Sequence, residues 1–179
     1  MNTVPSPVAH LRPHDVALAL QLALRPGMSY RALAEAVGVS QGETHNAVKR
    51  LAAARLVRPD TRAVHVGALL EFLAGGVPYA FAAAPGAETR GVPTAHAAPP
   101  LAADFPDADS VVWPALDGEH RGAAVAPLYA GAPATARRNP PLYELLTLVD
   151  ALRVGRARER QRARQLLQHR LTSIPGQHA

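Results

Sequence analysis

The 179-residue chain has no cysteine, a single lysine (Lys49), one tryptophan, three phenylalanines and four tyrosines. The absence of cysteine excludes disulfides, zinc–thiolate sites and a cysteine nucleophile. The wholly apolar runs extend over a few residues, far fewer than the roughly 20 that span a bilayer. Residues 1–10 also lack the cation and the apolar core of a signal peptide. The sequence therefore predicts a cytoplasmic protein without a membrane partner.

Catalytic and metal-binding motifs are missing as well. The eight histidines form no recognisable metal-binding motif, and there is no phosphate loop, nucleophile elbow or dinucleotide fingerprint. The one local grouping places four aspartates between two histidines, and scattered surface acids of a loop explain it better than a site: His96, Asp104, Asp107, Asp109, Asp117 and His120. We therefore expect no enzymatic activity, no metal and no cofactor.

Charge divides the chain into three parts. Residues 1–69 carry a net charge of +4, residues 70–138 of −3, and residues 139–179 of +4, which sum to the formal +5 of the chain. A basic balance favours a polyanionic partner. The patterning predicts a mainly α fold with a small β component and three regions, at 1–76, 77–138 and 139–179.

Three helices are expected at the start of the chain. The first, at 13–24, has Pro13 in its first turn and ends at Arg25-Pro26-Gly27. Its apolar residues alternate as in a strand, but the alanines between them are poor strand formers, so helix is favoured. The second begins after Ser29, an N-cap residue, and ends at Gly38.

The third helix is expected from Gln41 to about Ala54. Ser40 and Glu43 have the spacing of a capping box, in which each side chain bonds the backbone N–H of the other. The inward face of this helix consists of Thr44, Ala47, Val48 and Leu51. Residues 55–66 are typical of two short strands around a Pro-Asp turn, and a further helix is predicted at 67–74.

The segment from Ser29 to Ser40 (SYRALAEAVGVS), together with Ala47–Leu51 and Leu56-Val57, resembles the winged helix-turn-helix of bacterial transcription regulators such as the MarR and IclR families. The resemblance covers about residues 13–66. It implies that the helix at about 41–54 enters the major groove of double-stranded DNA and that the hairpin at about 55–66 is the wing. Operators with two half-sites also imply a homodimer.

The outward positions of the third helix are the candidate DNA contacts: Gln41, Gly42, His45, Asn46, Lys49 and Arg50. Glutamine and asparagine can bond adenine edges, and lysine can reach guanine acceptors. Phosphate contacts are expected from Arg31, Ser40 and Arg50, and wing contacts from Arg58 and Arg62. Glu43 beside DNA would repel phosphate unless it serves the cap. The alternative is an antitoxin-like or adaptor module that uses a winged-helix scaffold for protein contact.

Residues 70–141 contain eleven prolines and seven glycines. This composition predicts a Pro-rich, partly packed connector with short strands at about 111–113 and 123–129. A second protein could bind this region or the C-terminal helix.

The last region begins with a helix-start signal at Asn139-Pro140-Pro141. An apolar stripe follows, which is core or a dimer seam: Leu142, Leu145, Leu146, Val149 and Leu152. Gly155 interrupts the helix, which resumes at 156–171. Seven arginines occupy this region, and we interpret them as a solvated helix face rather than a nucleic-acid arm: Arg153, Arg156, Arg158, Arg160, Arg162, Arg164 and Arg170.

Overall fold

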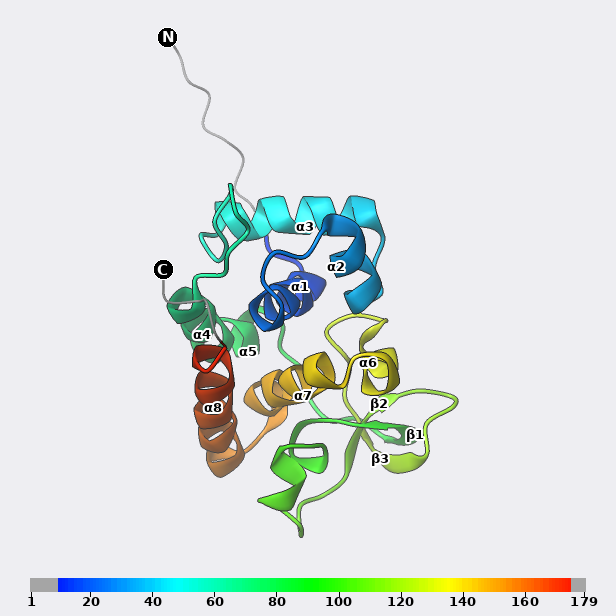
Figure 1. Cartoon of the computed structure of the whole chain (residues 1–179). Helices are drawn as coiled ribbons and strands as arrows, with labels where there is room; N and C mark the ends of the chain where they lie inside the picture. The colour runs from blue at the N-terminus through cyan, green and yellow to red at the C-terminus, as the bar shows by residue number, and fades with distance from the viewer. Residues whose placement is uncertain (1–9, 175–179) are drawn as a thin grey trace.

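The computed structural model describes residues 10–174, which form a mainly α fold with one small sheet (Figure 1). The N-terminal region folds into α1 (Pro13–Leu24), α2 (Tyr30–Val37) and α3 (Gln41–Ala53). These bounds confirm the three helices expected from the sequence. Within the described range, no helix is long and apolar enough to cross a membrane.

Helix α1 is the buried centre of the molecule. Every residue from 15 to 23 is buried, and Figure 1 shows α2 and α3 on one side of α1 and α7 on the other. A helix that is covered on all sides needs no polar face. This explains why the sequence of α1 lacks the usual amphipathic period.

Local capping defines the ends of α2 and α3. The Ser29 hydroxyl oxygen accepts the N–H of Ala32 at 3.1 Å, and that of Ser40 accepts the N–H of Glu43 at 3.2 Å. Gly38 ends α2 at φ 80°, in the left-handed region that favours glycine. The capping box also predicted a bond from the Ser40 N–H to the Glu43 carboxylate, and this prediction is wrong. The Glu43 carboxylate bonds the side chains of other residues instead.

The hairpin after α3 is shorter than predicted. Instead of two strands it has a single antiparallel bridge between Val57 and Val64, closed by a bond from the N–H of Arg58 to the carbonyl of Ala63. Pro59 lacks an N–H and Arg62 adopts φ 61°, so neither continues a strand ladder. Helix α4 (Val66–Gly75) follows as expected, and then the unpredicted α5 (Val77–Ala80).

The middle region forms a three-stranded sheet in which each strand pairs with both others. β1 (Glu88–Pro93) is antiparallel to β2 (Val111–Pro114) and to β3 (His120–Ala124), and β2 and β3 are parallel. So tight a closure leaves no room for a side chain at Gly122, where a Cβ would lie 2.6 Å from the Ser110 carbonyl oxygen. The short 3-10 helices η1 (Ala95–Ala97) and η2 (Leu101–Ala103) connect β1 to β2.

One strand prediction needs correction, and one strand was missed. β2 confirms the strand expected at 111–113, whereas the strand expected at 123–129 begins at His120 and ends at Ala124. Residues 125–129 are not part of the strand, and they include Pro127, which has no N–H to donate to a neighbouring strand. β1 was not predicted, because its sequence (ETRGVP) shows neither apolar alternation nor β-branched enrichment.

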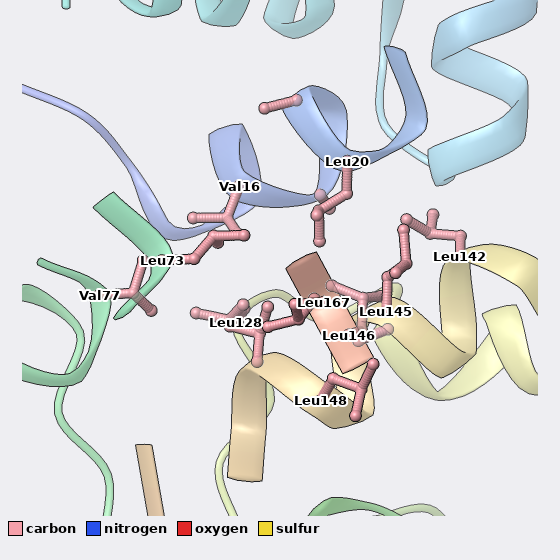
Figure 2. Close-up of a cluster of buried hydrophobic side chains, with 14 of the residues drawn as sticks. Val16, Leu20, Leu73, Val77, Leu128, Leu142, Leu145, Leu146, Leu148 and Leu167 are labelled. Carbon is pink, nitrogen blue, oxygen red and sulfur yellow. The ribbon is translucent and has the colours of Figure 1, made fainter. Parts of the chain in front are cut away.

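The middle region ends with α6 (Ala132–Arg138), which was not predicted, and the last region consists of α7 (Pro140–Val154) and α8 (Ala157–Thr172). The apolar stripe of α7 is at most 1% exposed within the single chain. Figure 2 shows Leu145 and Leu146 in one cluster with Val16 and Leu20 of α1 and Leu167 of α8. The stripe is therefore core, and its interpretation as a dimer seam is wrong.

Polar bonds join the later regions to the first three helices. The Asn139 side chain caps α7 and donates to Oε1 of Gln21 at 2.7 Å and to the carbonyl of Ala36 at 3.1 Å. The Tyr129 hydroxyl donates to the carbonyl of Val37 at 2.9 Å, and its burial raises its pKa. The sheet region and α7 thus support the helices that carry the candidate site.

A buried carboxylate anchors the sheet on α7. Asp150 accepts bonds from Nε1 of Trp113 at 2.5 Å, from the Thr94 hydroxyl at 2.8 Å and from Nη1 of Arg153 at 2.6 Å. Burial raises the pKa of Asp150, and the Arg153 charge opposes that shift. Arg153, whose side chain is 5% exposed, is therefore part of the interior and not of a solvated face.

Candidate nucleic-acid interface

Helix α3 lies at one edge of the molecule, with one face on the core and the other in solvent (Figure 1). The inward positions are those predicted, since Thr44, Ala47, Val48 and Leu51 are all buried. Five of the six predicted outward residues are exposed and follow one another along the helix: Gln41, Gly42, His45, Asn46 and Lys49. Glutamine, asparagine and lysine can each bond base edges. This face has the chemistry of a base-reading helix.

Arg50 is the exception and corrects the prediction. Its Nη2 donates to Oδ1 of Asp15 at 2.7 Å, its Nε donates to Oδ2 of the same carboxylate at 2.8 Å, and its side chain is only 16% exposed. This is the bidentate geometry that guanidinium and carboxylate favour. Arg50 therefore joins α3 to α1 instead of facing outward, as the sequence had predicted. Position 50 lies at the border of the outward face, and the helical period alone cannot reveal a buried acid on another helix.

Glu43 is neutralised by the same cluster. Its Oε1 accepts from Nη2 of Arg50 at 2.6 Å and lies 2.8 Å from Nε2 of His14 and 3.4 Å from Nη1 of Arg12. Hydrogen bonds from Arg50 and then His14 lower the pKa of Glu43. The acidic residue at the start of α3 therefore brings no uncompensated negative charge toward DNA.

This cluster also resembles a cation site, which the sequence did not predict. One ligand atom from each of His14, Asp15 and Glu43 lies within 4.8 Å of the others. The guanidinium of Arg50 bonds both carboxylates at 2.6–2.7 Å and lies 3.2 Å from the His14 ring nitrogen. The cation that these groups surround is therefore Arg50 itself.

Two contacts of the Tyr30 ring, which we call the Tyr30 stack, connect the hairpin to α2 and α3. The rings of Tyr30 and His45 have centroids 4.7 Å apart, and the guanidinium carbon of Arg62 lies 4.5 Å from the Tyr30 centroid. Tyr30 follows the N-cap of α2, His45 is on α3 and Arg62 is in the hairpin. Sequence reasoning missed Tyr30. The available signal was an aromatic residue at the first position of a helix that otherwise has small and charged residues on its outer side.

The remaining predicted contacts lie around this face. Arg31 is exposed and forms an ion pair with Glu35 at 3.0 Å, one helical turn away. Arg58 is exposed on the hairpin, and Ser40 is exposed at the start of α3, where its oxygen serves the cap. An exposed pair such as Arg31–Glu35 is weak and can exchange its partner for a phosphate.

The arginines of the last region do not extend this face. Figure 1 shows α8 below α4, with its C-terminal end next to α4 and its N-terminal end farther from α3. Arg153 is buried on Asp150, and three of the six arginines from residue 156 onward form ion pairs with acids of other segments, through Asp109, Asp104 and Glu144. These three pairs favour the interpretation of the arginines from residue 156 onward as a solvated helix face.

Comparison with known proteins agrees with this geometry. Residues 20–58, or 39 of the 179 residues, match a family model described as winged helix-turn-helix DNA-binding. The matched segment includes the end of α1, all of α2 and α3, and the first part of the hairpin. This part of the chain is a winged helix-turn-helix domain. No curated protein and no solved structure matches the chain.

Proposed function

We propose that this protein is a sequence-specific, double-stranded-DNA-binding transcriptional regulator, with α3 in the major groove and the hairpin at 55–66 as the wing. The observation that carries the proposal is the exposed face of α3, which presents base-bonding side chains within a segment that matches a DNA-binding family. A regulator of this type works in the cytoplasm, where bacterial DNA lies, and the proposal assigns no cofactor and no enzymatic activity.

Base reading is assigned to Gln41, Asn46 and Lys49. Asn46 and Lys49 are three residues apart and exposed on the same face, so both reach the floor of a groove that receives α3. Asparagine bonds adenine N6 and N7 together, and lysine bonds guanine O6 and N7. Gln41 lies two turns before Lys49 and would read a base pair on the near side of the site.

Phosphate contacts are assigned to Arg31, Ser40 and Arg58. Arg31 and Ser40 lie near the beginnings of α2 and α3, and Arg58 lies on the hairpin, so they surround the base-reading face. Such contacts position a protein on DNA without reading its sequence. Arg62 contributes indirectly, by fixing the hairpin against Tyr30. Arg50 is left out, because it is held by Asp15.

We further propose that the protein acts as a homodimer, since two copies of one α3 would read a site with two related halves. The α7 stripe cannot be the interface, because it is buried within the single chain. The interface must therefore use a surface outside the α7 core.

Selection from a pool of random duplex DNA tests the proposal. Full-length protein should enrich one motif at low salt and retain it, with weaker binding, at higher salt. The Asn46→Ala variant should relax the motif at one position, while Arg160→Ala, a change at an exposed α8 residue without an ion pair among residues 10–174, should leave the motif intact. If the wild type enriches no sequence, the proposed regulator function is wrong, and the alternative function as a protein-binding adaptor is favoured.

A further inference from the structure

A cavity of about 870 Å³ lies between the hairpin, α4 and the C-terminal end of α8. Its walls are mostly apolar and include Val64, Val66, Leu70 and Leu171. Two arginines and a histidine also line it, and no aspartate or glutamate does. A volume of this size lies within the range of roughly 300–1,000 Å³ that holds small molecules.

The composition of the lining decides the class of occupant. Apolar walls favour a hydrocarbon or aromatic body, and a site with cations and no acid favours a negative group on that body. We propose that this cavity binds an organic anion with an apolar body, whose charge is held by Arg55. A cationic ligand would be repelled by the Arg55 guanidinium.

Arg55 is placed for this role by the end of α3. It adopts φ 61°, a region that glycine occupies at lower cost, and its N–H donates to the carbonyl of Ala52 at 2.9 Å. The side chain is exposed, and no acid between residues 10 and 174 forms an ion pair with it. A non-glycine residue at a strained position is a feature of ligand sites. Its charge is available to a ligand.

The occupant would contact three separate elements of the chain. Ala63 and Arg58 belong to the hairpin, Leu70 to α4, and Leu171 and Thr172 to the end of α8. A bound anion would therefore link the wing to the C-terminal region. Binding itself does not depend on the proposed function, because the assay below contains no DNA.

Two fluorescent probes with the same ring systems test the charge requirement. 8-Anilinonaphthalene-1-sulfonate carries a sulfonate, whereas N-phenyl-1-naphthylamine does not. We expect the folded full-length chain to bind one sulfonate probe per molecule, at least tenfold tighter than the neutral probe. Absence of binding, or equal affinity for the two probes, would overturn the proposal.

Variants locate the bound probe. Arg55→Gln should weaken binding of the sulfonate probe about tenfold and leave the neutral probe unaffected. Ala63→Trp, which adds volume at the lining, should abolish binding of both. Arg160→Gln is the control, because Arg160 is an exposed α8 arginine outside the cavity lining. If both Arg55→Gln and Ala63→Trp fold, as judged by their melting temperatures, and bind the probes as the wild type does, the probe does not bind in this cavity and the proposal is wrong.

The chain's own C-terminus is the competing occupant, because Leu171 and Thr172 line the cavity. A variant that ends at Ile174 removes residues 175–179 and should bind the sulfonate probe with unchanged affinity. A tenfold gain would mean that this segment fills the cavity, which would contradict a site for a separate anion.

Discussion

Arg50 of α3 donates to both carboxylate oxygens of Asp15 on α1, a residue 35 positions earlier that is 1% exposed. A buried carboxylate is tolerated only when a charge and hydrogen bonds compensate its lost hydration. The pair therefore sets the position of α3 on the core, and with it the orientation of the face that we propose reads bases.

The first prediction concerns this pair. Arg50→Ala leaves Asp15 buried without a cation and should lower the free energy of unfolding by about 3 kcal/mol, as measured by urea denaturation. The double variant Arg50→Ala/Asp15→Asn should recover part of that loss, because the uncompensated charge is gone. An Arg50→Ala protein with unchanged stability and uniformly weaker DNA binding would mean that Arg50 contacts phosphate.

Glu43 gives stability a pH dependence. Bonds from Arg50 and His14 lower the pKa of Glu43 in the folded protein below its usual value of 4.5. A carboxyl whose pKa is lower in the folded state stabilises the protein above the unfolded pKa, and this contribution is lost as pH falls through the folded pKa. Stability should therefore decline as pH falls below about 4.5, the usual glutamate value, and Glu43→Gln should flatten part of that decline. An identical pH profile in Glu43→Gln would show that the cluster does not hold the charged form.

The Tyr30 stack leads to a third prediction. Tyr30→Ala removes the ring that contacts both Arg62 and His45, and should lower the free energy of unfolding by about 1–2 kcal/mol, the sum of one cation–π contact and one aromatic pair. Tyr30→Phe keeps the ring and is the matched control, expected to lose about 0.5 kcal/mol or less. Equal losses in the two variants would assign the effect to the hydroxyl and not to the stack.

The α7 stripe can be tested as core against seam. Leu146 is 1% exposed and lies in the cluster with Leu20 (Figure 2), so Leu146→Ala should cost about 2–5 kcal/mol of stability. Its oligomeric state, followed by light scattering over a range of concentrations, should equal that of the wild type. A variant that keeps its stability but dissociates to monomers would show that the stripe is a dimer interface.

Local signals in the sequence predicted most helices correctly. Ser29, Gly38 and Ser40 mark the boundaries of α2 and α3 through bonds to their own neighbours, which a sequence shows directly. The inward face of α3 also follows from the helical period. For the same reason, five of the six outward residues of α3 were identified.

Errors arose where distant residues decide the structure. The orientation of Arg50 depends on Asp15, and the burial of α1 on all sides depends on α7, more than 100 residues later in the chain. β1 has no strand pattern of its own and exists because β2 and β3 pair with both of its edges. Long-range pairs of this kind have no signature in a single sequence.

Protection of DNA from methylation by dimethyl sulfate is the most direct test of α3 as the base-reading helix. This reagent methylates guanine N7 in the major groove and adenine N3 in the minor groove, so one experiment distinguishes the grooves. On the selected site, the wild type should protect guanine N7 at one or more positions. Lys49→Ala should lose protection at one guanine while still binding the site. Protection of adenine N3 alone, or guanine protection unchanged in Lys49→Ala and Asn46→Ala, would contradict the placement of α3 in the major groove.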